Sequence, residues 1–173
     1  MAKSIIKRKR DFVYLVFFIT RIVMMLAFDL TPYYPDQIKP RWMTALRAWY
    51  IATYADRFFY APPPWFPVLA FLQLIYHFPL SVWAVGALLQ HNPRTPLALL
   101  VFGLEGSITA LICLLEMLSW EELTDEQRGL GGLGGLYGGY LAFAFLMALD
   151  CYARLDGWIT RQKQLVPFAK KEL

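Results

Sequence analysis

Apolar residues dominate four long stretches of the chain, each interrupted by very few polar side chains. The runs cover residues 12–28, 61–90, 96–115 and 129–149. An α-helix needs about 20 apolar residues to cross a hydrocarbon core about 30 Å thick, and each run approaches that length. We therefore predict an all-α membrane protein: one transmembrane domain over residues 1–173, built as a four-helix bundle with spans at about 11–30, 62–90, 95–119 and 129–153 and a cytosolic tail at 154–173.

The loop between the first two predicted spans has its own pattern. Prolines bracket a segment rich in Trp, Tyr and Ala, and we expect a short helix there from about Pro40 to Tyr54. Amphipathic aromatic rings settle at membrane interfaces, so the helix would lie as a cap over the lumenal end of the bundle. The same residues would serve equally well as an ordinary interfacial anchor.

Composition and charge support this picture. The chain is 58% hydrophobic and only 17% charged, which excludes a soluble core of this size and leaves little sequence for a separate soluble domain. Basic residues precede the first span, lie between spans two and three and follow span four, so the positive-inside rule places both termini in the cytosol. The net charge of +4 lies mostly at the membrane edge and calls for no nucleic-acid partner.

Two short features concern targeting. The basic cluster at residues 7–10 precedes a run of full spanning length with no cleavage site, which indicates a retained signal anchor. The chain ends in Lys170, Lys171, Glu172 and Leu173, which matches a dilysine retrieval signal for the endoplasmic reticulum. A solvated basic tail is the alternative. We predict a multi-pass protein of the endoplasmic reticulum membrane.

Glycines crowd the start of the fourth run, with several pairs spaced four residues apart. Small residues let helix backbones approach closely in lipid, so we favour tight packing, within the bundle or in a homodimer, over a role in making room for a ligand. Because glycine weakens helices, the first turns of this span are expected to be irregular. The glycines are Gly129, Gly131, Gly132, Gly134, Gly135, Gly138 and Gly139.

Polar side chains inside the spans are the candidates for function. Glu105 and Arg21 each lie about ten residues into a span, near the middle of the bilayer, where a charge normally marks a functional site or a buried pair. An Arg21–Glu105 ion pair and a ligand contact for Glu105 are both open. Gln73 and His77 share one helix face, where they would line a pocket or bond neighbouring helices. A lone histidine makes no metal site, and we expect no metal and no cofactor.

Several motifs together resemble a known family. They are Phe28-Asp29-Leu30, Trp49-Tyr50 followed by Asp56, Pro63-Pro64-Trp65-Phe66, Leu72-Gln73-Leu74 with Phe78-Pro79, Arg94-Thr95-Pro96, and Tyr137-Gly138-Gly139-Tyr140-Leu141. In this order and spacing they resemble the EXPERA-domain membrane proteins, in particular the sigma-2 receptor type, over nearly the whole chain. The chain also resembles fungal members linked to delivery of mitochondrial precursors.

The resemblance implies an endoplasmic-reticulum protein whose intramembrane cavity binds sterols and cationic amphiphiles. It implies that Asp29 contacts a ligand amine, that Asp56 supports the same site, and that Gln73 replaces a glutamic acid as hydrogen-bond donor to Asp29. Arg21 stands where that pattern has histidine and would discourage a cationic ligand. The predicted ligand-binding residues are Arg21, Asp29, Asp56, Gln73, His77, Glu105, Tyr137 and Tyr140.

Two rival functions remain at this point. The same domain occurs in the sterol Δ8–Δ7 isomerase, where acids and a histidine move protons, and Glu105, Glu116 and His77 are candidates for those parts. The isomerase type is a longer chain with five spans, whereas four spans are predicted here. We therefore favour a binding protein with no catalytic residues. The expected partners are a sterol or amphiphilic lipid, membrane lipids and a membrane protein. A trafficking partner without any ligand is the third class.

Overall fold

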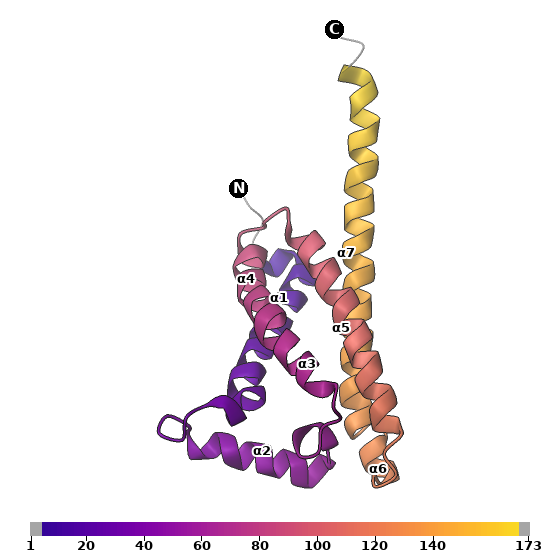
Figure 1. The fold of residues 1–173 in the computed structure, drawn as a ribbon. Helices are drawn as coiled ribbons and strands as arrows, with labels where there is room; N and C mark the ends of the chain where they lie inside the picture. Colours follow the sequence, from indigo (N-terminus) through magenta and orange to yellow (C-terminus); the bar gives the residue numbers. More distant parts are fainter. Residues whose placement is uncertain (1–4, 170–173) are drawn as a thin grey trace.

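Four helical spans dominate the computed structural model, which describes residues 5–169 and side chains as far as residue 162 (Figure 1). The helices long and apolar enough to cross a membrane run over Lys9–Asp29, Phe66–Leu89, Thr95–Leu118 and Asp125–Gln162. Within the described residues every regular element is helical. The predicted all-α bundle of four spans is confirmed.

The spans are assembled from shorter elements. A single turn, η1 (Ile5–Lys7), precedes α1 (Lys9–Met24), which continues as the π-helical turn η2 (Met25–Asp29) and is followed by η3 (Thr31–Tyr33). The connection to the second span holds α2 (Arg41–Tyr54) and η4 (Arg57–Phe59). The second span joins α3 (Phe66–Leu72), the π-helical turn η5 (Gln73–His77) and α4 (Phe78–Leu89). The third is α5 (Thr95–Leu118), and the fourth joins α6 (Asp125–Arg128) to α7 (Leu133–Ala169).

The spans associate as two pairs, α1 with α4 and α5 with α7 (Figure 1). The second pair is close because α5 carries glycine where it meets α7. A Cβ atom added at Gly103 would lie 2.7 Å from the backbone oxygen of Ala144 and 2.9 Å from the backbone nitrogen of Ala148. No real Cβ tolerates such a separation, so this crossing requires glycine.

The glycines predicted to pack helices have a different role. A Cβ at Gly132 or Gly134 would lie 2.1 or 2.3 Å from the backbone of α6, and one at Gly135 would lie 1.9 Å from the backbone of the α6–α7 connection. Residues 129–132 form turns and α7 begins only at Leu133, which confirms the expected irregular start. The glycine run therefore permits a tight turn, whereas close helix packing depends on Gly103 of α5.

Pro79 explains why the second span changes its winding. It lies at the second position of α4 and directly follows the π-helical turn η5. Proline has no N–H to donate and its ring collides with the carbonyl four residues earlier, so the preceding turn must widen. The wider turn ends at His77, whose side chain is 5% exposed.

The cap helix forms where the sequence predicts it. Pro40 is the residue preceding α2 and Tyr54 is its last residue. α2 lies across the end of the bundle reached by α3 and α6 (Figure 1), which we call the cap end. Beneath it, Phe58 stacks on Phe66 at 4.6 Å and meets the ring of Trp120 edge-on at 4.9 Å. Trp49, by contrast, is 57% exposed, as suits an interface.

The opposite end of the bundle, which we call the basic end, gathers the start of α1, the α4–α5 connection and the later part of α7 (Figure 1). The first span therefore begins, and the last span ends, on the same side of the bundle, as an even number of spans requires. α7 has 37 residues and a length of about 55 Å, so it continues as helix through residues 154–169, which we predict as a tail. The proposed retrieval signal, Lys170 and Lys171, lies outside the described residues.

Candidate intramembrane ligand site

A chain of three polar side chains crosses the middle of the bundle. The Arg21 guanidinium Nη2 lies 2.7 Å from His77 Nδ1, and His77 Nε2 contacts a carboxylate oxygen of Glu105. Arginine can only donate, so His77 Nδ1 accepts and its proton lies on Nε2, directed at Glu105. A continuous hydrogen-bonded chain therefore runs from the guanidinium through the imidazole to the carboxyl group.

A direct ion pair between Arg21 and Glu105, one of the two roles that the sequence leaves open, does not form. His77 stands between them, and the ion pairs recorded among the described residues join Glu105 only to His77. The imidazole enters because the π-helical turn η5 rotates His77 inward from the second span. The two side chains are therefore linked through the imidazole and not by a direct contact.

Three polar atoms of this cluster remain unpartnered although they are buried. They are Arg21 Nε, Glu105 Oε1 and the hydroxyl of Tyr140. The Tyr140 ring lies 5.0 Å from the Arg21 guanidinium, and its hydroxyl would approach a Cβ at Gly106 to 3.1 Å. Buried polar groups in native proteins are nearly always paired, so three spare atoms around one point indicate a position for a ligand or an ordered water.

The second part of the predicted site lies toward the cap end. Gln73 donates a hydrogen bond through its side-chain nitrogen to Asp29, as the resemblance implies. Asp29 ends the π-helical turn η2, and Gln73 begins the turn η5. Both distorted turns therefore present polar side chains to the same interface between the first two spans, and such turns are frequent at functional sites.

Asp56 forms a third and separate cluster beneath the cap. It is 0% exposed, and its carboxylate accepts hydrogen bonds from the hydroxyls of Tyr137 at 2.7 Å and Tyr50 at 3.0 Å and from the N–H of Phe58 at 3.1 Å. Burial raises the pKa of the Asp56 carboxyl above its ordinary range, while these three donors act in the opposite direction. The cluster joins the cap, η4 and α7.

The predicted residues therefore meet in three groups instead of one cavity. Arg21, His77, Glu105 and Tyr140 lie at mid-membrane, Asp29 pairs with Gln73, and Asp56 binds Tyr137. Glu116 is about 16 Å along α5 from Glu105 and contacts Trp120, so the isomerase-like set does not assemble completely. Neither hollow found at the two ends of the bundle contains any of the eight residues.

Sequence reasoning missed two residues that shape the site. Tyr50 was read as an interfacial aromatic, yet it donates to buried Asp56 and packs edge-on against Phe28 at 4.9 Å. Arg47 places its guanidinium 4.6 Å from the Phe59 ring and donates to the backbone oxygen of Phe59 at 3.3 Å. A basic or aromatic residue in a loop gives no sign of such contacts, because they depend on where the cap docks.

A family model agrees with this architecture. The model described as EXPERA (expanded EBP superfamily) matches residues 42–151, from the cap helix to the last span. This chain belongs to the EXPERA family. The match includes Asp56, Gln73, His77 and Glu105 together with both tyrosines, whereas Arg21 and Asp29 lie on the first span, outside the matched EXPERA segment.

A curated relative is the Efficient mitochondria targeting-associated protein 19 of Schizosaccharomyces pombe (strain 972 / ATCC 24843). It is 27% identical over 150 residues, which cover 84% of this chain and 76% of the relative. The similarity thus extends beyond the residues matched by the EXPERA model. It agrees with the resemblance to fungal members on which the sequence-based expectation rests.

Proposed function

We propose that this EXPERA protein is an endoplasmic-reticulum membrane protein that binds a sterol or lipid-like molecule between its two helix pairs. It would act in sterol or lipid homeostasis, or in the trafficking of membrane proteins and mitochondrial precursors. The observation that supports ligand binding is the group of spare polar atoms on Arg21, Glu105 and Tyr140 in the middle of an otherwise apolar bundle.

A sterol suits this environment chemically. Its single hydroxyl can donate to Glu105 Oε1 and accept from the Tyr140 hydroxyl or from Arg21 Nε. Its rigid rings would lie against aromatic side chains such as Phe102, which already contacts the site at 4.8 Å from the His77 ring. One hydroxyl would thus relieve several unpaired buried groups, each of which otherwise costs about 1–3 kcal/mol.

The direct test is to identify the molecule that accompanies the protein. Purification in mild detergent followed by lipid mass spectrometry should find a sterol or an uncharged amphiphile at about one per chain. Glu105→Gln should reduce its recovery, while Glu116→Gln, on the same helix but remote from the cluster, should not. Preparations that carry only bulk phospholipid in both variants and wild type would contradict the proposal.

The cellular role is proposed from the name of the fungal relative and from the chain's topology. We propose that the basic end faces the cytosol and that Lys170 and Lys171 return the protein to the endoplasmic reticulum. Tags at residues 1 and 173 should both be digested in intact microsomes, and Lys170→Ser with Lys171→Ser should release the protein from that compartment. A protected C-terminus would contradict this orientation.

An isomerase is the second candidate, favoured by the direct contact between His77 and Glu105. An imidazole and a carboxyl that share a hydrogen bond can move a proton to and from a double bond. The separation of Glu116 weakens this alternative. If the protein only binds ligand, its expression in cells lacking sterol Δ8–Δ7 isomerase should not restore Δ7 sterols, whereas restoration abolished by Glu105→Gln would establish the enzyme.

A further inference from the structure

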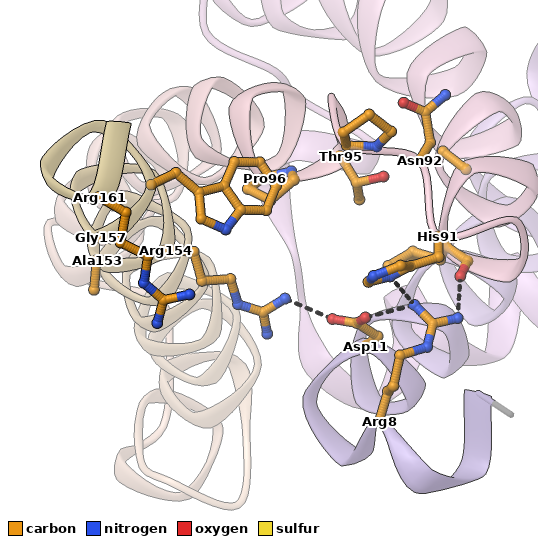
Figure 2. A pocket seen from close by; sticks show the side chains of 14 residues that line it. Arg8, Asp11, His91, Asn92, Thr95, Pro96, Ala153, Arg154, Gly157 and Arg161 are labelled. Carbon is orange, nitrogen blue, oxygen red and sulfur yellow. Dashed lines mark hydrogen bonds and ion pairs between the residues drawn. The ribbon is translucent and has the colours of Figure 1, made fainter. Parts of the chain in front are cut away.

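A hollow of about 370 Å³ opens at the basic end, remote from the intramembrane site (Figure 2). Its walls come from the start of α1, the α4–α5 connection, the first residues of α5 and the later part of α7. Figure 2 shows that side chains from all these elements converge on one space. The charged and polar members of the wall are Arg8, Asp11, His91, Asn92, Thr95, Arg154 and Arg161.

Positive charge predominates in this wall, with three guanidinium groups and a single carboxylate. That carboxylate, Asp11, is already occupied on both oxygens, by Arg8 at 2.7 Å and by Arg154 at 2.6 Å. Arg154 also pairs with Asp150 at 2.7 Å. Arg161 enters no ion pair with any of the residues described, so its charge is available to a ligand.

Thr95 supplies a buried donor to the same space. It is 8% exposed, and its hydroxyl has no hydrogen-bond partner. It is also the first residue of the 24-residue helix α5, whose positive dipole end therefore borders the hollow. The same wall thus contains a buried hydroxyl without a partner, a helix N-terminus and an arginine without an ion pair, which together form a set of donors suited to a tetrahedral oxyanion.

His91 is held in an unusual conformation at the rim. It follows α4 with a φ of 55°, the left-handed region that glycine normally occupies at this position, and its Nδ1 lies 2.8 Å from Arg8 Nη1. Because arginine only donates, His91 Nδ1 is the acceptor of this hydrogen bond. Arg8 also donates to the backbone oxygen of Leu88 at 2.8 Å, so contacts with Asp11, His91 and Leu88 hold its guanidinium in place.

We propose that this hollow binds the phosphate group of a membrane lipid. The depth favours a lipid headgroup over a soluble phosphate, because Arg8 and Thr95 stand at the beginnings of two membrane spans, where headgroups lie. Trp158, an interfacial residue type, also lines the hollow, and the apolar residues Leu88 and Pro96 belong to the same wall. The site is independent of the proposed sterol site, which lies within the bundle.

Two variants test the site without disturbing intramolecular bonds. Thr95→Val removes only an unpartnered hydroxyl, and Arg161→Gln removes only an unpaired charge. Arg94→Gln is the matched control, because Arg94 is exposed at the same end of the bundle but is not part of the wall. Binding of dioctanoyl phosphatidic acid to the full-length protein in detergent should saturate at one site and weaken about tenfold in each of the first two variants.

The control and the competing ligands decide the interpretation. Arg94→Gln should bind phosphatidic acid within about twofold of wild type, and inorganic phosphate should bind at least about a hundredfold more weakly than the lipid, because it gains nothing from apolar contact. Equal weakening by Arg94→Gln and Arg161→Gln, with Thr95→Val unchanged, would reduce the effect to general attraction at a basic surface. Inorganic phosphate bound as tightly as the lipid would overturn the assignment to a headgroup.

Discussion

Asp56 and Glu105 are both carboxyl groups enclosed by the bundle, but their surroundings differ. Asp56 is 0% exposed and accepts from two tyrosine hydroxyls and a backbone N–H. The Glu105 side chain is 23% exposed, with one oxygen contacting His77 and the other buried without a partner. A carboxyl whose hydrogen bonds are complete holds a fold together, whereas one with a spare oxygen is available to a ligand.

This difference divides into two sets the residues that the family resemblance assigns to a single ligand site. Asp56, Tyr50 and Tyr137 form a closed set that fixes the cap to the last span. Arg21, Glu105 and Tyr140 form an open set in which each residue keeps an unpaired atom. We therefore expect variants of the closed set to change stability and variants of the open set to change ligand affinity.

The largest effect is expected for Asp56→Ala. It leaves the hydroxyls of Tyr50 and Tyr137 without their acceptor, at about 1–3 kcal/mol for each buried donor. Thermal unfolding in detergent, followed by tryptophan fluorescence, should show a strongly lowered midpoint. Asp36→Ala is the control, because the Asp36 side chain is 94% exposed and pairs only with Lys39. A similar midpoint for both variants would remove Asp56 from the structural set.

Asp29 is intermediate between Asp56 and Glu105 in how fully its carboxyl group is hydrogen-bonded. One of its oxygens accepts from Gln73, and Asn at this position keeps an acceptor for that amide. Asp29→Asn should lower affinity for a cationic amphiphile by about 1–3 kcal/mol, the range for a charge-assisted hydrogen bond, and leave a neutral sterol much less affected.

Arg21→His tests whether the charge of Arg21 competes with a cationic ligand for Asp29. It removes a fixed positive charge that acts on the Asp29 carboxyl group, so amine affinity should rise relative to wild type. Binding of one amine and one sterol to purified wild type and both variants provides the measurement. Amine affinity unchanged in both folded variants would make Asp29 a purely structural residue, like Asp56.

Glu105→Gln addresses the open set directly. The amide oxygen can still accept from His77, so the main loss is the anionic acceptor offered to a ligand hydroxyl. Sterol affinity should fall about tenfold, which corresponds to about 1.4 kcal/mol. Glu116→Gln on the same helix serves as control, since Glu116 contacts Trp120 at 3.5 Å and lies outside the cluster. Equal losses in both variants would place the ligand elsewhere.

Hydropathy and motif spacing were sufficient for the framework. The four spans follow from the length of apolar runs, and α2 follows from prolines around an aromatic segment. The contact between Gln73 and Asp29 was expected from the resemblance and is present. The length of α7 was not predicted, because hydropathy indicates where a membrane span ends and not where the helix ends. Gly157 and Pro167 are the helix-breaking residue types after residue 153, and α7 continues through both to Ala169.

The arrangement of the polar residues was beyond sequence reasoning for physical reasons. Whether Arg21 meets Glu105 or His77 depends on how far the π-helical turn η5 rotates the second span, a rotation of one residue that periodicity does not register. The glycine run predicted a helix interface, yet only the fold shows that Gly103 makes it. Basic residues such as Arg8 and Arg161 served as topology signals, and their convergence on one hollow appears only in three dimensions.

The smallest expected effect is also the cleanest, because two tyrosines one helical turn apart on α7 allow the same atom to be deleted from each set. Tyr137→Phe removes a hydroxyl that donates to Asp56 at 2.7 Å and should lower the free energy of unfolding by about 0.5–1.5 kcal/mol. Tyr140→Phe removes a buried hydroxyl that has no protein partner, so stability should be unchanged or slightly increased. Its sterol affinity should fall about threefold to tenfold, whereas Tyr137→Phe should bind sterol like wild type. Chemical denaturation and sterol binding on the same preparations measure both quantities, and a loss of stability with unchanged affinity in Tyr140→Phe would mean that the open set is closed by a tightly held water and not by a ligand.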